Sequence, residues 1–461
     1  MTFTRRNFLE TGMLATAGCT LSGCFTTSSL TGQAPVPILR KAGFRKPGDK
    51  LRMAFIGSWG RGGANLGEFY NLGEEIVALC DVDLGNLERA AKKVEQRCPK
   101  ARRYQDWREL LDKEKDLDAV VVSTPDHMHA ACAIAAMERG CHVYVEKPLV
   151  RTWWEAERFR EVAKACGVVT QMGNNGNGGD GQRRNIEILK SGVLGDVREI
   201  HVTTNRPIWP QGLNRPEGAD TPPQNLDWNL WLGVAPKRPF KKGVYHTFKW
   251  RGWFDFGTGA FGDIGCHAMS FFWRGLDLRE VISVETIKTT QKFDEAYPAA
   301  TTVRLVVSSG VQKEPISIYW YDGDTCPPPE TCRRLTNGRL DKIGGVLISG
   351  AKGTFWNGQI MMAGESRFIR HQDHPATKEI PVTLPRVKGH HWEFAEAVRG
   401  GARPFSDYDH SVPLTEAVLL GCIAQRVEGR LAWNAKQGRF TNSEAANALL
   451  KPYVRYGWSI G

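Results

Sequence analysis

The sequence predicts an α/β protein, with a doubly wound parallel sheet in its N-terminal part and a largely antiparallel open sheet in its C-terminal part. Strand-like apolar runs alternate with helical patterns from residue 51 to residue 172. After residue 173 this alternation ends and strand-like runs follow one another. A chain of 461 residues is too long for one ordinary core and long enough for two domains.

The N-terminal part contains five strand-like runs. We expect strands at 51–57, 75–81, 117–124, 142–146 and 168–172, and helices up to residue 65 and at 84–96, 126–139 and 153–166. Alternation of this length predicts parallel strands joined by right-handed crossovers. Ligands of such sheets bind at the carboxyl ends of the strands.

The C-terminal part, residues 173–461, is expected to form a second α/β domain. Strands are predicted at 196–206, 281–290, 300–308, 314–322 and 344–357, and helices at 389–399 and 412–427. We expect the substrate cleft between this domain and the carboxyl edge of the first sheet.

The first 24 residues have the features of a targeting segment. Thr4-Arg5-Arg6-Asn7-Phe8-Leu9 resembles a twin-arginine export signal, and Leu21-Ser22-Gly23-Cys24 resembles a bacterial lipobox after a short apolar run. We therefore expect export by the twin-arginine route to the periplasm, which allows a lipid anchor at Cys24. Residues 25–50 are rich in Ser, Thr, Pro and basic residues and are predicted to be a flexible linker.

Composition argues against several other classes of protein. The net charge is +11, but no dense basic cluster is present, so nucleic-acid binding is not expected. No apolar run of about 18 residues, the length of a spanning helix, follows the N-terminal segment. The spacing of His127 with His129, and of His390 with His391, does not suit zinc, and no metal is expected.

The 11 cysteines include no CxxC pair, which argues against a zinc ribbon. Cys326 and Cys332 flank a proline-rich loop. In an oxidising compartment they form either a disulfide or two free thiols, and the sequence leaves both open.

A glycine-rich turn follows the first predicted strand. Gly57, Gly60 and Gly62 let the backbone turn tightly and approach a pyrophosphate, which the next helix stabilises with its N-terminal N–H groups. Trp59 stands where such turns usually carry a second glycine, and Arg61 lies inside the motif. Taken alone, the motif also fits an ordinary glycine-rich loop.

Two later strand ends favour dinucleotide binding. Asp81 ends the second predicted strand, where a carboxylate binds a ribose 2′-hydroxyl and repels a 2′-phosphate, so NAD is favoured over NADP. Thr124 and Pro125 lie at the end of the next strand and can line the same cleft. Residues 51–172 are therefore predicted to form an NAD-binding Rossmann domain.

Lys147, Asp263 and His267 are the candidate catalytic residues. Lys147 follows a predicted strand, and Asp263 and His267 are spaced to share one face of a helix. A neutral histidine can accept a hydroxyl proton, Asp263 can orient its ring, and a lysine can stabilise charge on the oxygen. The alternatives are a helix cap for Asp263, a core position for His267 and a surface position for Lys147.

At this point the chain resembles the Gfo/Idh/MocA oxidoreductases. Glu146-Lys147-Pro148 matches the family's EKP motif, and Asp263 with His267 matches its D-x-x-x-H motif. Segment 124–129 matches one that approaches the nicotinamide ribose in the family. Segments 226–233, 250–260, 413–418 and 456–458 resemble an often exported bacterial subgroup.

The resemblance implies a Rossmann domain, an α/β domain with an open sheet, bound NAD(P), sugar or polyol substrates, and homo-oligomers packed through that sheet. With the motifs above, it gives as candidate cofactor-binding residues Gly57, Trp59, Gly60, Arg61, Gly62, Asp81, Thr124, Pro125, His129, Glu146, Lys147 and Asn174. Tyr245, Trp250, Arg251 and Trp253 are candidate substrate residues, although packing roles suit them equally.

The sequence departs from the family pattern at two places. Trp59 replaces the usual second glycine, and Asn177 stands where related sequences often carry histidine. An acid–base role of that histidine is therefore not transferred to this chain, although Asp180 nearby offers an acid.

We predict an NAD-dependent oxidoreductase that acts on a hydroxyl of a sugar, glycoside or polyol and yields a keto-sugar. Because free NAD is scarce outside the cytoplasm, export favours tightly bound NAD. One alternative is a redox-neutral glycosidase like glycoside hydrolase family 109, to which the similarity is distant. The other is a non-catalytic sugar-binding protein, which the intact Lys147, Asp263 and His267 disfavour.

Overall fold

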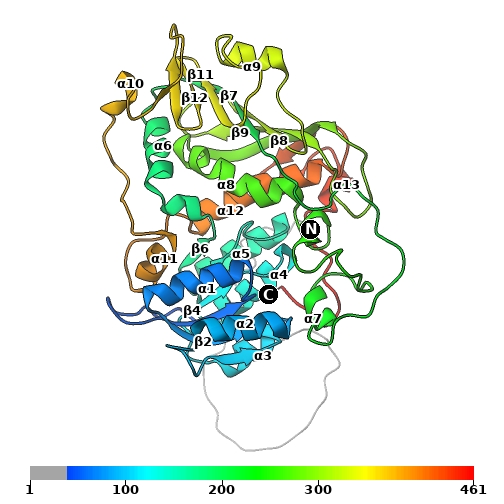
Figure 1. The fold of residues 1–461 in the computed structure, drawn as a ribbon. Coiled ribbons are helices and arrows are strands. Elements are labelled where there is room, and N and C mark those ends of the chain that lie inside the picture. The colour runs from blue at the N-terminus through cyan, green and yellow to red at the C-terminus, as the bar shows by residue number, and fades with distance from the viewer. Residues whose placement is uncertain (1–38, 461) are drawn as a thin grey trace, which may run out of the picture. The chain divides into compact units, whose positions relative to one another are not determined.

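The computed structural model describes residues 39–460 (Figure 1). The predicted export signal and Cys24 lie outside the described residues. Across residues 39–460, no helix combines the length and apolar character needed to cross a membrane.

The first sheet has six parallel strands in the order β3-β2-β1-β4-β5-β6. This is the strand order of a Rossmann fold, and the predicted doubly wound sheet is confirmed. The strands are β1 (Arg52–Ile56), β2 (Glu75–Cys80), β3 (Arg102–Tyr104), β4 (Ala119–Val122), β5 (His142–Val145) and β6 (Thr170–Met172). The helices are α1 (Arg61–Leu72), α2 (Leu84–Val94), α3 (Trp107–Lys113), α4 (Asp126–Glu138) and α5 (Trp153–Cys166).

Local sequence explains where these elements lie. Strands β4 and β5 are buried along their whole length, as expected for central strands of a parallel sheet. Helix α5 begins with a capping box, in which Thr152 and Glu155 satisfy each other's backbone N–H groups, and it ends at the left-handed Gly167. The short β3 and α3 were not predicted.

The second sheet has ten strands in the order β14-β13-β12-β11-β7-β10-β9-β8-β15-β16. Its pairs are antiparallel except β7 with β10, so the prediction of a largely antiparallel sheet is confirmed. The strands are β7 (Val197–Thr203), β8 (Leu278–Thr289), β9 (Thr301–Ser309), β10 (Ile316–Tyr321), β11 (Gly345–Gly350), β12 (Gly353–Trp356), β13 (Gln359–Met362), β14 (Ile369–Arg370), β15 (Leu431–Asn434) and β16 (Arg439–Phe440). The run predicted at 344–357 is thus a hairpin of β11 and β12.

Helices cover the inner face of the second sheet. α8 (Gly259–Gly275) and α12 (Tyr408–Ala424) pack against each other and lie between this sheet and the Rossmann domain (Figure 1). Phe261 of α8 stacks on Trp320 of β10, with ring centroids 4.6 Å apart. The remaining helices are α6 (Asp180–Lys190), α7 (Trp228–Leu232), α9 (Pro329–Leu335), α10 (Pro375–Lys378), α11 (His390–Val398) and α13 (Glu444–Asn447).

The segment that precedes β1, predicted to be part of a flexible linker, is held against the Rossmann domain from residue 39 onward. The backbone N–H groups of Arg40 and Ala42 donate to the carbonyls of Glu138 and Cys166, which end α4 and α5. Arg45 forms an ion pair with Asp118, just before β4, at 2.7 Å. These contacts all lie at the amino edge of the first sheet.

Residues 225–251, here called the bridging segment, belong to the second part of the chain but reach the Rossmann domain. The segment contains α7, which lies beside α2 and α3 in Figure 1. Its aromatic residues, including Trp231 and Tyr245, form a cluster with Trp253 and Phe256. Cys326 and Cys332, for which two states were open, are both free thiols, and Cys332 is buried in α9.

Candidate active site

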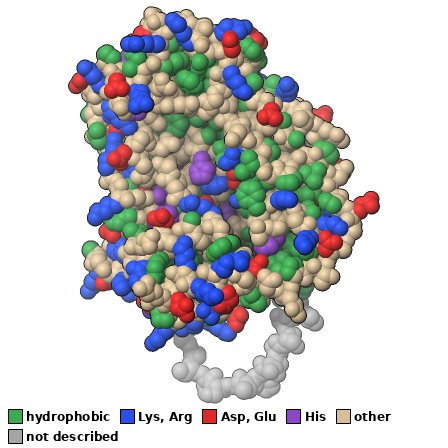
Figure 2. Space-filling model, in the orientation of Figure 1, with side chains coloured by type: hydrophobic (Ala, Val, Ile, Leu, Met, Phe, Trp, Pro, Cys, Tyr) green, Lys and Arg blue, Asp and Glu red, His purple; other side chains and the backbone are tan. Residues whose placement is uncertain are grey.

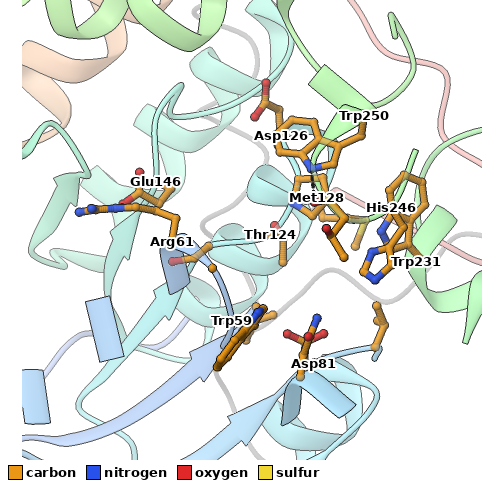
Figure 3. Close-up of a pocket in the computed structure, with 18 of the residues that line it drawn as sticks. Trp59, Arg61, Asp81, Thr124, Asp126, Met128, Glu146, Trp231, His246 and Trp250 are labelled. Carbon is orange, nitrogen blue, oxygen red and sulfur yellow. Dashed lines mark hydrogen bonds and ion pairs between the residues drawn. The ribbon is translucent and has the colours of Figure 1, made fainter. Parts of the chain in front are cut away.

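A cleft of about 380 Å³ lies at the carboxyl ends of β1, β2, β4 and β5, and the bridging segment forms its opposite wall (Figure 3). Twelve of the predicted site residues line it: Gly57, Trp59, Gly60, Arg61, Asp81, Thr124, Pro125, His129, Glu146, Lys147, Trp250 and Arg251. Figure 2 shows histidine side chains in a hollow of the surface, with Lys and Arg side chains beside them.

The turn between β1 and α1 has the geometry that a pyrophosphate requires. A side chain at Gly57 would place its Cβ 2.6 Å from the carbonyl oxygen of Ser123, and one at Gly62 would lie 1.8 Å from the carbonyl oxygen of Gly57. Gly60 precedes α1 and offers no side-chain cap, so the first N–H groups of the helix are available to an anion. Gly62 does not line the cleft, and its role is close packing.

Trp59 lies beside this turn and lines the cleft. Its ring is 44% exposed, and the guanidinium of Arg89 lies 4.6 Å from the ring centroid. A Cβ on Gly63 would lie 3.9 Å from Cε3 of this ring, so Trp59 packs beside the first turn of α1.

Asp81, at the end of β2, is half-buried and accepts the backbone N–H groups of Ser58 at 3.2 Å and Asp83 at 3.0 Å. Burial raises its pKa to about 6, so the carboxylate is mostly ionised at pH 7. Each oxygen keeps a free lone pair for a ribose hydroxyl. Among the described residues, the buried hydroxyl of Thr124 has no hydrogen-bond partner, which suits a polar ligand in the cleft. These groups fit NAD.

Glu146 joins α1 to the end of β5. It accepts hydrogen bonds from Arg61 and Asn65, both at 2.9 Å. Burial favours the neutral carboxyl, but the charge of Arg61 and the hydrogen bonds hold the pKa of Glu146 below its usual value. His129 contacts the carbonyls of Thr124 at 2.9 Å and Pro148 at 2.8 Å, and thereby fixes two loops of the cleft.

Lys147 and Arg251 share one carboxylate. Lys147 Nζ lies 2.7 Å from Asp263 Oδ1, and Arg251 Nε lies 3.1 Å from the same oxygen. Burial opposes ionisation of Asp263, but the two cations lower its pKa below the usual value. Thr258, not Asp263, precedes the first turn of α8, so Asp263 is not the helix cap. The side chains of Lys147 and Asp263 are each 14% exposed.

His267 lies one turn after Asp263 on α8 and is half-buried. Burial and the positive charge of Lys147 lower its pKa to about 4, which leaves the imidazole neutral at pH 7. His267 and Asp263 do not line the cleft themselves, whereas Lys147 does. Asn174 is buried beside them and donates to the carbonyl of Cys266 at 2.9 Å.

Asn177, which differs from the family pattern, and the nearby Asp180 do not line the cleft. Asn177 is buried and donates to the hydroxyls of Ser270 at 2.9 Å and Ser406 at 2.6 Å. Asp180 is exposed at the start of α6. Neither residue is placed to act as an acid in the described cleft.

The four predicted substrate residues divide into two pairs. Trp250 and Arg251 line the cleft, and the guanidinium of Arg251 lies 4.3 Å from the ring centroid of Trp250. Tyr245 and Trp253 are about 1% exposed and belong to the aromatic cluster behind the wall, so the structure gives them packing contacts.

Sequence reasoning missed several residues of the cleft. Asp126 lines it and accepts a hydrogen bond from Thr258 at 2.7 Å. Trp231 and His246 come from the bridging segment, where no periodic pattern marks them. Asp126 lies inside the 124–129 motif, so the motif could have predicted it. Trp231 and His246 reach the cleft only through contacts between distant parts of the chain.

The strand order, the glycine turn and the carboxylate after β2 define a protein with an NAD-binding Rossmann fold. Two family models match the chain: the oxidoreductase family with an NAD-binding Rossmann fold over residues 51–174, and the C-terminal alpha/beta domain of that family over residues 187–312. The chain belongs to the Gfo/Idh/MocA oxidoreductase family.

Curated relatives match part of the chain. A glycosyl hydrolase family 109 protein of Shewanella baltica is 33% identical over 202 residues, which are 42% of this chain and 44% of the relative. An alpha-N-acetylgalactosaminidase of Shewanella oneidensis is 32% identical over the same shares. The match spans less than half the length of these relatives.

Solved structures share the fold over most of the chain. The WlbA dehydrogenase of Chromobacterium violaceum, in complex with NADH and UDP-GlcNAcA, has 20% identity and a TM-score of 0.58, covering 85% of this chain and 99% of that one. The aldose-aldose oxidoreductase of Caulobacter crescentus, complexed with glycerol, has 17% identity and a TM-score of 0.56, covering 84% and 100%.

Proposed function

We propose that the protein oxidises a hydroxyl group of a sugar, glycoside or polyol to a ketone, using a tightly held NAD. The observation that carries this proposal is the Lys147–Asp263–Arg251 cluster, which stands at the same sheet edge as the glycine turn and Asp81. When bound, NAD accepts the hydride from the substrate carbon. Lys147 and Arg251 thus line the same cleft as the nucleotide cradle, and Asp263, which they share, lies directly behind them.

Side chains of the protein accept the proton of the substrate hydroxyl and stabilise the negative charge on its oxygen. His267, neutral at pH 7, accepts the hydroxyl proton as the C–H bond breaks. Lys147 donates a hydrogen bond to the substrate oxygen and stabilises the negative charge that develops there. Asp263 holds Lys147 in place at 2.7 Å.

A redox-neutral glycosidase is the second candidate function, because the curated relatives are family 109 hydrolases. In that reaction, transient oxidation at C3 acidifies the C2 proton, elimination releases the aglycone, and water and hydride are then returned. The buried Asn177 and the exposed Asp180 disfavour it, since neither supplies an acid in the cleft.

One experiment separates the two functions. The mature protein is purified, its bound nucleotide is identified, and it is incubated with aryl glycosides without added cofactor. We expect absorbance of reduced bound NAD and a keto-glycoside, with the aglycone still attached. Aglycone release without net NADH would favour the glycosidase, and a protein that neither contains nor binds NAD would overturn both functions.

The preference for NAD over NADP is proposed to depend on Asp81. Asp81→Ala removes the carboxylate that hydrogen-bonds the ribose hydroxyls and repels a 2′-phosphate, so the ratio of the NADPH and NADH dissociation constants should fall about tenfold or more. Fluorescence titration of both nucleotides measures this ratio. An unchanged ratio would remove Asp81 from cofactor selection, and Glu75→Ala, at the far end of β2, serves as the control.

A further inference from the structure

We infer that the bridging segment forms a second wall around the adenosine half of NAD, with His246 and Trp231 as its contacts, and that this wall slows release of the cofactor. The inference rests on the proposed use of NAD. Both residues lie outside the Rossmann domain and would contact the cofactor from the opposite side of the cleft.

The segment is hydrogen-bonded directly to the loop that carries the ribose site. The backbone N–H of Leu84 donates to the carbonyl of Asn225 at 2.8 Å, and that of Asp227 donates to the carbonyl of Val82 at 3.0 Å. Together these bonds form an antiparallel bridge between Asp83 and Leu226. The bridge lies two residues after Asp81, the proposed ribose ligand.

The carboxylate of Asp83 contacts the segment at two points, near its start and near its end. Its Oδ1 accepts Asn225 Nδ2 at 2.6 Å, and its Oδ2 contacts His246 Nε2 at 3.1 Å. The same carboxylate caps α2 through the N–H of Gly85 at 2.9 Å. The position of the segment is therefore coupled to the helix that flanks the ribose site.

The side chains of the segment face the ribose site across the cleft. In Figure 3, His246 and Trp231 lie on one side of the cavity and Asp81 and Trp59 on the other. Trp231 is 4% exposed, and its carbonyl contacts His127 Nε2 at 3.1 Å. Its ring stacks on Trp228 at 4.6 Å. The side of Trp231 that faces away from the cleft is therefore packed against other residues of the protein.

A nucleoside bound at Asp81 would be enclosed between these two sides. Release then requires the contacts at Asp83 to break, so the segment should act on the dissociation rate more than on the association rate. This geometry gives a physical basis for a cofactor that stays bound through export and many catalytic cycles.

The test is the rate at which NADH leaves the purified full-length protein, followed by its fluorescence during a chase with excess NAD. The double variant Asn225→Ala/His246→Ala removes both side-chain contacts to Asp83 and should release NADH about tenfold faster. Arg439→Ala breaks an exposed ion pair with Glu444 and should leave the rate unchanged, because within residues 39–460 neither side chain contacts the segment.

Asn225 is exposed, so the single variant Asn225→Ala tests the same contact without risk to folding. Its rate should lie between those of the wild type and the double variant. Equal release rates in all variants would overturn the inference while leaving sugar oxidation intact. Failure of the wild type to bind NADH would overturn both the inference and the proposed function.

Discussion

His267→Ala should lower turnover of the NAD-loaded protein by about three orders of magnitude while NAD binding persists. A positioned general base contributes about 10²–10⁴-fold to such proton transfers, and no other neutral imidazole shares the α8 face with Asp263 in the described residues. Turnover is measured with the sugar identified in the aryl glycoside experiment, and bound NAD is measured after gel filtration. His371→Ala, far from the cleft, is the matched control.

The dependence of turnover on pH tests independently whether His267 is the general base. The pKa of His267 is lowered to about 4, so the ring is neutral above that pH and protonated below it. Wild-type turnover should therefore stay level from pH 7 to about 5 and fall as the pH drops through about 4. Unchanged turnover in His267→Ala, or an acid limb near the ordinary histidine pKa, would exclude this role.

Asp263→Ala should lower activity and cost about 1–3 kcal/mol of stability, because the half-buried Lys147 and Arg251 lose the carboxylate that they share. Urea unfolding measures the free energy of unfolding. Asp341→Ala removes an exposed ion pair with Arg333 and should cost less than about 1 kcal/mol. Equal losses in the two variants would show that the carboxylate of Asp263 stabilises the fold no more than an exposed ion pair does.

The sequence predicted the elements whose signals are local. Helix α5 was placed at its observed bounds because Thr152, Glu155 and Gly167 mark its two ends. Strands β4 and β5 were found because they are apolar runs buried on both faces. β3 and α3 were missed because the strand is three residues long and exposes two arginines, and the helix presents a mostly charged surface.

The same distinction holds for the site. Two motifs gave Lys147 and Asp263 as candidate catalytic residues, and in the structure their side chains form an ion pair. The contact of Asp83 with His246 was not predicted, since it joins two loops 163 residues apart in the sequence. Only the tertiary arrangement of the bridging segment brings His246 to the cleft, so no periodicity or spacing could reveal it.

Residues 40–45 attach to the amino edge of the first sheet, whereas the cleft opens at its carboxyl edge. The hydrogen bonds to Glu138 and Cys166 hold this attachment at the ends of α4 and α5. The attachment and the route by which a ligand enters are therefore separated by the full length of the parallel strands. Substitutions at the attachment should consequently change the stability of the Rossmann domain without obstructing the opening between Asp81 and His246.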